Sequence, residues 1–287
     1  MHCTTLIPLA TKRPMVATVH DVAFLHYPEF FTRRGNRVFR RSVVALKSRA
    51  AKVLCSSSAT LNDLRDLGFS EERLRFVPLG VRHVEVTDED RARVREKLSL
   101  PSDYLLFVGT LEPRKNVDRL VRAFARLVRD GLPHSLVLAG GRGWDYAAID
   151  RAVADEGIGH RVIIPGYVRR EDQPLWYSAA DLFTYPSQYE GFGLPVLEAL
   201  ACGTPVVTSN SSSLPEVVGR AGLVIDPSDE SSLAEAMRSV LTDGTLAARL
   251  RDAGPVQAAQ FSWARSAAGC VRAYREAAAD ASQGGRA

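Results

Sequence analysis

The sequence contains few cysteines, and none of its apolar runs is long enough to cross a bilayer. No window approaches the roughly 18 uninterrupted apolar residues of a spanning helix, and the opening residues lack the basic start and long apolar run of a signal peptide. The cysteines lie far apart, without the paired spacing of a metal site: Cys3, Cys55, Cys202 and Cys270. Reduced thiols are their expected state. We therefore expect a cytoplasmic protein that at most contacts a membrane peripherally.

A strong excess of charge of either sign is also absent. Lys plus Arg total 37 against 33 Asp plus Glu, which gives a formal net charge of +4. This balance is too mild for a dedicated nucleic-acid binder, so nucleic acid is not an expected partner. An anionic small ligand and an anionic membrane surface both remain compatible with it. The 287 residues, 46% of them hydrophobic, are enough for two domains with substantial cores.

Short apolar runs alternate with amphipathic stretches, a pattern typical of parallel sheets covered by helices. In the first part of the chain we expect strands at 15–19, 52–55 and 74–77 and helices at 32–50 and 57–68. Later strands are expected at 104–108, 135–139, 161–164, 182–184, 205–208 and 223–225, with a last helix at 263–279. The polar stretch 81–89 is the expected linker. The predicted domains are therefore 1–85 and 86–262, followed by a segment at 263–287 that crosses back to the first domain.

The segment from Gln188 to Glu198 is the densest in chemistry. Glu190 precedes a Gly-Phe-Gly turn, after which Leu194-Pro195 starts a helix with proline in its first turn. The N–H groups of residues 191–194 would face an anion at the positive end of that helix. Glu198 follows about two turns along the helix. A ligand that combines a phosphate with sugar hydroxyls would satisfy this arrangement.

Other chemical groups follow predicted strands. They are His20, Gly109-Thr110 with Arg114-Lys115 close behind, Gly140-Gly141 and the segment 187–193. Ligands of open parallel sheets bind outside the carboxyl ends of the strands. We therefore expect these loops to surround one binding region.

Glu190 and Glu198, separated by seven residues that include Gly-Phe-Gly-Leu-Pro, resemble the Glu-x7-Glu element of the family 4 retaining glycosyltransferases. The similarity extends from His20 to about Trp263 and includes, in the order that family keeps, 108–116, 139–141, 205–207 and 214–218. The resemblance implies the α/β GT-B fold, in which two Rossmann-like doubly wound domains face a cleft. It also implies a nucleotide-diphosphate sugar as donor, with GDP-mannose as the first expectation because the Gly-Thr-Leu-Glu-Pro-Arg-Lys-Asn variant is similar to mannosyltransferase-like members. A glycan, a lipid-linked molecule or a small molecule would be the acceptor.

The resemblance also implies roles for individual residues. Glu190 and His20 are the expected catalytic residues at the transferred sugar, and Glu198 is expected to bind the ribose hydroxyls. The expected donor-binding residues are Gly109, Thr110, Arg114, Lys115, Tyr167, Val168, Gly191, Phe192, Gly193, Leu194 and Glu198. Thr110 stands where many relatives have an arginine, so Lys115, Arg114 and the helix dipole must neutralise more of the diphosphate charge. No Asp-x-Asp motif lies beside these elements, so we expect no metal and no cofactor.

Competing interpretations remain at this point. The Gly-x-Gly turn and the two glutamates are also compatible with a helix cap and a solvated helix face. An NAD-dependent dehydrogenase fits poorly, because Ala139-Gly140-Gly141-Arg142-Gly143 is only a fragment of the dinucleotide fingerprint. A non-enzymatic alternative is an inactive or partner-dependent nucleotide-sugar-binding module that has lost its acceptor half.

The N-terminal part carries two further expectations. Arg33, Arg37, Arg40 and Arg41 recur on one helical face, which indicates either a solvated basic face or contact with anionic lipid. Before the linker the pattern predicts three strands, whereas a doubly wound domain carries about six. We therefore expect the N-terminal domain to be incomplete, with no counterpart of an opening strand and glycine-rich turn before Pro14, and with sheet edge and apolar surface exposed on residues 1–80.

Overall fold

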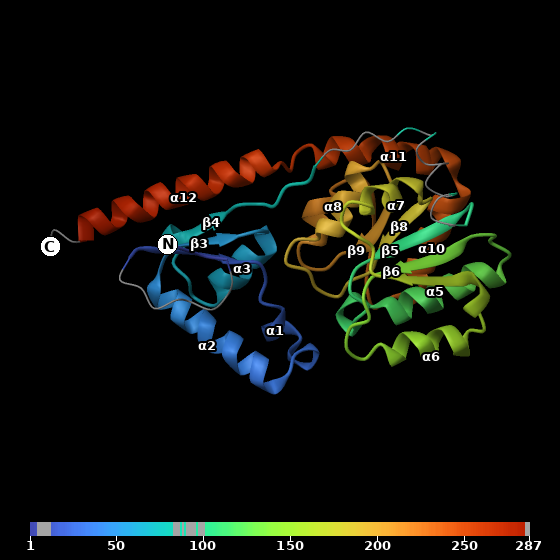
Figure 1. Ribbon diagram of the computed structural model, residues 1–287, viewed down its shortest axis with the longest axis horizontal. Helices are drawn as coiled ribbons and strands as arrows, with labels where there is room; N and C mark the ends of the chain where they lie inside the picture. The colour runs from blue at the N-terminus through green and yellow to red at the C-terminus, as the bar shows by residue number, and fades with distance from the viewer. Residues whose placement is uncertain (5–12, 83–86, 88, 90–95, 97–100, 285–287) are drawn as a thin grey trace. The chain divides into compact units, whose positions relative to one another are not determined.

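The computed structural model describes residues 1–4, 13–82, 87, 89, 96 and 101–284 (Figure 1). The chain forms two compact units. Unit 1 contains Met1–Gly80, Glu190–Phe192 and Phe261–Ala287, and unit 2 contains Val81–Tyr189 and Gly193–Gln260. Much of the predicted linker, residues 83–86 and 88, lies outside the described residues.

The described part of unit 1 contains a parallel sheet of order β1-β2-β3-β4. Its strands are β1 (His2–Cys3), β2 (Met15–Val19), β3 (Ala50–Cys55) and β4 (Leu74–Phe76). The three predicted strands are confirmed, and β1 is a further strand that the pattern did not predict. β1 pairs with β2 through His2 and Val16. A strand of two residues is too short to show the alternation on which sequence reasoning depends.

The helices of unit 1 begin where the sequence provides caps. The Thr32 hydroxyl accepts the N–H of Gly35 at 3.1 Å, and the Ser57 hydroxyl accepts that of Thr60 at 3.0 Å, as expected for Ser and Thr at N-caps. The helical elements are α1 (Ala23–His26), η1 (Pro28–Phe30), α2 (Arg33–Arg49), α3 (Ser58–Asp66), η2 (Glu71–Arg73) and α12 (Trp263–Gly284).

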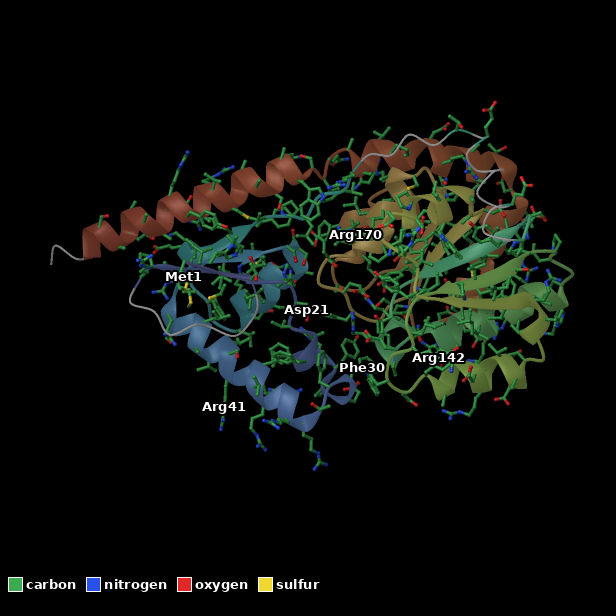
Figure 2. The ribbon with its side chains drawn as sticks, in the orientation of Figure 1. Met1, Asp21, Phe30, Arg41, Arg142 and Arg170 are labelled. Atoms are coloured by element: carbon green, nitrogen blue, oxygen red, sulfur yellow. The ribbon has the colours of Figure 1, made fainter. Side chains whose placement is uncertain are left out.

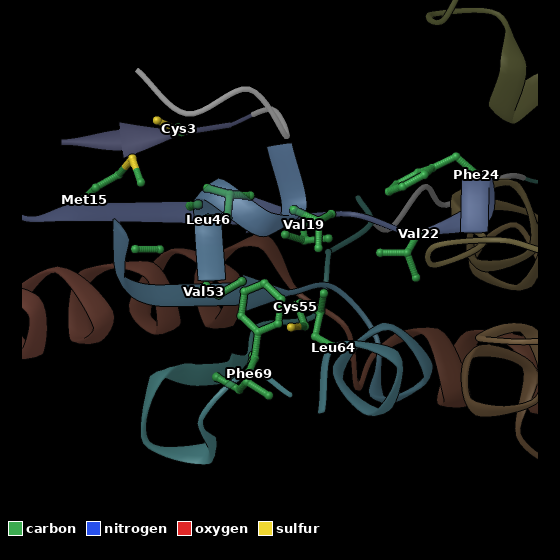
Figure 3. Close-up of a cluster of buried hydrophobic side chains, with 14 residues drawn as sticks. Cys3, Met15, Val19, Val22, Phe24, Leu46, Val53, Cys55, Leu64 and Phe69 are labelled. Carbon is green, nitrogen blue, oxygen red and sulfur yellow. The ribbon is translucent and has the colours of Figure 1, made fainter. Parts of the chain in front are cut away.

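The two faces of this sheet are covered by different helices. Successive side chains of β2 and β3 point to opposite faces, so each strand contributes to both apolar clusters. Ala17 and Val53 belong to a buried cluster with Leu46 of α2 and Leu64 of α3 (Figure 3). The residues that point the other way belong to a cluster with α12, consisting of Val16, Leu54, Val77, Ala273 and Ala277. Unit 1 is therefore a sheet with apolar packing on both faces.

Polar contacts also fasten α12 to the sheet of unit 1. Arg75 Nε lies 2.7 Å from Glu276 Oε2, and Lys52 Nζ lies 2.8 Å from Asp280 Oδ2. All the cysteines are free thiols, and burial raises the pKa of Cys55 to about 12, so this thiol stays protonated. No helix in the described part of the chain is long and apolar enough to span a membrane.

The described part of unit 2 contains a parallel sheet of order β10-β9-β8-β5-β6-β7. Its strands are β5 (Tyr104–Val108), β6 (Ser135–Ala139), β7 (Val162–Gly166), β8 (Leu182–Tyr185), β9 (Val206–Ser209) and β10 (Gly222–Ile225). Every strand predicted in this part is confirmed. Because β5 lies between β6 and β8, the chain order reverses beside β5, which is where ligands of doubly wound sheets bind.

Helices cover both faces of this sheet (Figure 1). They are η3 (Pro113–Lys115), α5 (Val117–Arg129), α6 (Ala147–Asp155), η4 (Gly159–Arg161), α7 (Gln173–Ala179), α8 (Leu194–Ala201), α9 (Leu214–Val218), α10 (Glu230–Thr242) and α11 (Gly244–Ala258). α5 packs against α6 and α10, and α8 packs against α7, α9 and α11. The carboxyl ends of the strands are therefore bordered by the loops that follow them.

Candidate functional site

The loops after β5, β6 and β7 of unit 2 are joined by backbone hydrogen bonds. The N–H of Gly109 donates to the carbonyl of Ala139 at 3.0 Å, and the N–H of Gly140 donates to that of Gly166 at 2.8 Å. The backbones approach so closely that a β-carbon at position 140 would lie 1.8 Å from the carbonyl oxygen of Gly109. Only glycine fits there, and the three loops form one continuous rim.

Lys115 is held at this edge between β5 and β8. Its ammonium Nζ donates to the Tyr185 hydroxyl at 2.7 Å and lies 5.1 Å from the centre of that ring. Asn116, whose left-handed φ of 60° ends the turn η3, donates from Nδ2 to the carbonyls of Pro186 and Pro227. Although it is a lysine, Lys115 is buried, with 7% of its surface exposed. A buried cation fixed by an aromatic hydroxyl is suited to binding an anion.

Arg114 is engaged differently from its neighbour. Its guanidinium donates from Nη1 to the carbonyl of Tyr189 at 2.6 Å and from Nη2 to Glu112 Oε1 at 2.8 Å. Its own carbonyl accepts the N–H of Gln188 at 2.9 Å. Arg114 therefore anchors the segment directly before Glu190, a positioning contact that sequence reasoning missed.

The helix α8 begins with the glycine turn and the proline that the sequence predicted. Gly193 caps the helix with a φ of +103°, and a β-carbon there would lie 2.7 Å from Leu214 Cδ2. Pro195 follows in the first turn, where its missing N–H is not needed. The first N–H groups of a helix have no partner within the helix, which is why helix starts are common sites for anions.

Glu198 projects from α8 in a half-buried position. Its Oε2 accepts a hydrogen bond from the Tyr177 hydroxyl at 3.1 Å. Burial raises the pKa of Glu198 above its ordinary value, while the Tyr177 hydrogen bond and the charge of Arg170 act in the opposite direction. Burial and the neighbouring Glu198 also raise the pKa of Tyr177 well above normal. This carboxylate is therefore desolvated but has one donor fixing it, as a binding group requires.

The loop after β7 presents an exposed aromatic ring. Gly166 has a φ of +83°, Tyr167 is 76% exposed, and Val168 is buried at 7%. Thr110, at the end of β5, is exposed as well. The backbone of 166–168 lies on the rim formed by the joined loops, where a flat group could be bound.

In unit 1, His20 and residues 190–192 lie together. The carbonyl of His20 accepts a hydrogen bond from Thr60 Oγ1 at 3.0 Å, and Ser56 Oγ lies 3.2 Å from the carbonyl oxygens of both His20 and Gly191. A β-carbon at Gly191 would lie 2.2 Å from the His20 carbonyl oxygen. The His20 side chain is exposed, whereas only 8% of Glu190 is exposed.

The predicted site residues thus form two groups. Unit 1 contains His20, Glu190, Gly191 and Phe192, and unit 2 contains Gly109, Thr110, Arg114, Lys115, Tyr167, Val168, Gly193, Leu194 and Glu198. Sequence reasoning missed the supporting residues Ser56, Thr60, Tyr177 and Tyr185. Of these, Ser56 directly follows the end of β3, which was a usable signal. Among the described residues, no cluster of three His, Cys, Asp or Glu side chains is arranged to hold a metal ion.

Comparisons with protein families match nearly the whole chain. The family described as Glycosyltransferase Family 4 matches residues 1–84, and the family described as Glycosyl transferases group 1 matches residues 88–257. Both descriptions agree with the resemblance predicted from the sequence.

Individual relatives are glycosyltransferases too. The chain is 34% identical to O-antigen chain mannosyltransferase B of Escherichia coli, over 91% of this chain and 70% of the relative. It is 29% identical to the serotype-specific mannosyltransferase WbdA of Escherichia coli, of which it spans 32%. It is 33% identical to a D-inositol 3-phosphate glycosyltransferase of Acidothermus cellulolyticus, over 93% of this chain and 63% of the relative.

Solved structures agree on the fold. Sucrose-phosphate synthase from Thermosynechococcus elongatus matches with a TM-score of 0.78 at 28% identity, over 91% of this chain and 67% of that one. Anabaena Alr3699/HepE, solved in complex with UDP and glucose, matches with a TM-score of 0.77 at 24% identity, over 88% of this chain and 68% of that one. The predicted GT-B class of α/β fold is confirmed by these likenesses.

Proposed function

Because the chain belongs to the family 4, group 1 glycosyltransferases, we propose that it is a retaining hexosyltransferase that uses a nucleoside-diphosphate sugar, with GDP-mannose as the first candidate. The mannosyltransferases among its relatives support mannose. A glycan is the favoured acceptor, because the relative of which the chain covers 70% is named an O-antigen chain mannosyltransferase. No metal or cofactor is part of this proposal.

The observation that carries the proposal is a pair of ionisable groups in unit 2, buried Lys115 and half-buried Glu198, each held by a tyrosine hydroxyl. Lys115 is fixed by Tyr185, and Glu198 is fixed by Tyr177. Ionisable side chains that are desolvated and held by a neighbouring hydroxyl are typical of ligand-binding sites. In the proposal, Lys115 and the N–H groups at the start of α8 bind the diphosphate, and Glu198 accepts hydrogen bonds from the ribose hydroxyls. The base then lies against the backbone of 166–168.

The proposed reaction breaks the bond between the sugar C1 and the diphosphate oxygen. The acceptor oxygen bonds to C1 on the same face, and the acceptor proton passes to the departing phosphate oxygen. Glu190 and the His20 side chain bind and orient the transferred sugar. Lys115 and the α8 amides stabilise the negative charge that develops on the leaving group. Such electrostatic stabilisation by fixed dipoles and charges is usually the largest single contribution to an enzyme's rate enhancement.

A membrane-proximal acceptor is the second part of the proposal. α2 carries seven basic and no acidic residues, and its exposed arginines include Arg33, Arg34, Arg37, Arg40 and Arg41. Arg41 points away from the sheet of unit 1 (Figure 2). Val44 is also exposed, at 70%. This composition favours contact with anionic lipid at about 1 kcal/mol per basic residue near the surface. If these arginines are only a solvated basic face, sedimentation of the protein with liposomes should not depend on anionic lipid.

Liposome co-sedimentation separates these interpretations. We expect binding to rise with the fraction of anionic lipid, to fall with salt, and to weaken in an Arg33→Ala, Arg37→Ala, Arg41→Ala triple variant. If sedimentation did not change with anionic lipid or with salt, the proposed membrane contact would be excluded. The proposed transferase activity would be unaffected by that result.

The test of the main proposal is release of nucleoside diphosphate from a panel of nucleotide sugars, together with calorimetric binding. Glu198→Ala should weaken donor binding, whereas Glu190→Ala should mainly lower turnover, because one carboxylate binds ribose and the other the transferred sugar. Glu235→Gln is the control, since this exposed glutamate lies on α10. If wild-type protein bound donor but never turned it over with any acceptor, the binding-module alternative would replace the enzyme.

A further inference from the structure

Unit 1 contains a cavity of about 610 Å³ at the amino ends of its strands. Met15, which begins β2, and Ala277 of α12 are among its lining residues, and both are buried. The other end of β2 leads to His20. A strand of five residues is about 17 Å long at ~3.3 Å per residue. The cavity is therefore separate from the loops around His20.

Basic side chains dominate the polar lining. The described lining contains four cationic groups and two anionic ones: Arg13, Arg49, Lys52 and Arg73, with Glu72 and Asp280. Arg73 donates from Nη1 to the carbonyl of Lys47 at 3.1 Å, which leaves most of its N–H donors for other partners. An anion entering this cavity meets a net positive charge.

Lys52 is the central group. Its side chain is only 8% exposed, although it lies on a strand at the border of the cavity. The ammonium donates to the carbonyl of Glu72 at 3.1 Å and pairs with Asp280 Oδ2 at 2.8 Å. An ammonium has three donors, and these two contacts are the ones it makes within the described residues. The Asp280 side chain, by contrast, is 55% exposed, so water can replace its lost contact if it moves away.

We propose that this cavity is a binding site for the phosphate dianion of a soluble small molecule, and that the ligand takes the place of Asp280 on Lys52. A phosphate oxygen presents the same charge-assisted acceptor as the carboxylate and adds oxygens for Arg13, Arg49 and Arg73. The volume admits a phosphate with a small organic group such as a sugar. Because Asp280 belongs to α12, occupation of the cavity releases one of the ion pairs that fasten the end of this helix.

The test titrates the whole chain with inorganic phosphate by calorimetry, with chloride at matched ionic strength as the blank and saturating GDP present to occupy the donor site. Lys52→Met, which keeps an apolar stem of similar length, should weaken phosphate binding at least about tenfold, since a charge-assisted hydrogen bond is lost. Asp280→Asn should tighten it about fivefold or more, because the competing carboxylate is neutralised. Asp155→Asn, which removes an exposed carboxylate of unit 2, is the control and should not change the phosphate affinity.

Equal phosphate affinity in wild-type, Asp280→Asn and Lys52→Met proteins would overturn the proposal, as would absence of binding in both wild-type and Asp280→Asn proteins. If Lys52→Met failed to fold, the Asp280→Asn comparison alone would decide. A second arm compares glucose 6-phosphate with vesicles containing phosphatidic acid. Lys52-dependent binding of the soluble ester is expected, and Lys52-dependent binding of the vesicles alone would overturn the soluble source. None of these outcomes depends on whether the chain transfers a sugar.

Discussion

Replacement of Glu198 by glutamine should make the protein bind nucleotide less tightly and yet be more stable at neutral pH. The carboxylate is half-buried on α8, and burial raises its pKa. The folded protein therefore keeps this proton at pH values where the unfolded chain has already lost it. Consequently the free energy of unfolding falls as pH rises from the unfolded pKa to the folded pKa, and it stays lower above that range. Glutamine does not ionise, so the variant avoids this loss.

The magnitude for binding follows from the hydrogen bonds. Hydrogen bonds to a charged partner contribute about 1.5–3 kcal/mol, against about 0.5–1.5 kcal/mol for neutral ones. Exchanging two ribose contacts from the charged to the neutral kind costs roughly 2–3 kcal/mol, which is about 30- to 150-fold in the dissociation constant. Glutamine keeps the size of the side chain, so this loss reports the charge and not a cavity.

The assay combines calorimetry with thermal unfolding at about pH 4 and at about pH 7.5, on either side of the ordinary glutamate range. The melting temperature of Glu198→Gln relative to wild type should rise between these two pH values. Tyr177→Phe is the matched variant: it removes the hydroxyl that donates to Glu198 Oε2 at 3.1 Å, so the pKa of Glu198 should rise further and the pH effect should grow. Unchanged nucleotide affinity together with a pH-independent difference in melting temperature would show that Glu198 neither binds nucleotide nor has a raised pKa.

Three further predictions follow from close approaches and buried charge. Gly140→Ala should destabilise unit 2 by about 1–3 kcal/mol or more, because the new β-carbon would lie 1.8 Å from the Gly109 carbonyl oxygen. Denaturant unfolding measures this loss. Gly141→Ala is the control and should be near neutral, because a β-carbon there meets nothing within 4 Å. Gly191→Ala should lower turnover at least about tenfold and largely keep donor binding. The reason is that a β-carbon 2.2 Å from the His20 carbonyl oxygen displaces the loop that carries Glu190. If the variant turned over as fast as wild type, the placement of this loop would be contradicted. Lys115→Met should weaken binding of nucleoside diphosphate about tenfold or more and leave that of the nucleoside unchanged, since only the phosphates use the ammonium; an equal loss for both ligands would point to misfolding.

Much of the fold could be predicted from local pattern. The bounds of β2, β5 and β6 were predicted to the residue, because each is a short apolar run between turn residues. β7 runs on to Gly166 although the pattern ended it before Pro165. It pairs only with β6 at the edge of the described sheet, and proline is tolerated in an edge strand.

The site was predictable where glycines and charged residues follow strands, but not in its supporting contacts. The hydrogen bonds of Arg114 to Tyr189 and of Thr60 to His20 join residues 75 and 40 positions apart. Such contacts depend on tertiary geometry, and side chains of these types are equally common on solvated surfaces. The same reason explains why a basic residue such as Lys52 gave no signal before its burial was known.

We propose above all that this chain transfers a hexose from a nucleoside diphosphate with retention of configuration. The most direct measurement is proton nuclear magnetic resonance of the anomeric signals while wild-type protein, GDP-mannose and a mannose-terminated glycan react. We predict that GDP appears together with an α-linked product, and that Glu190→Ala suppresses both signals. A β-linked product would contradict retention, and the absence of GDP release with every nucleotide sugar and acceptor tried would contradict the transferase itself.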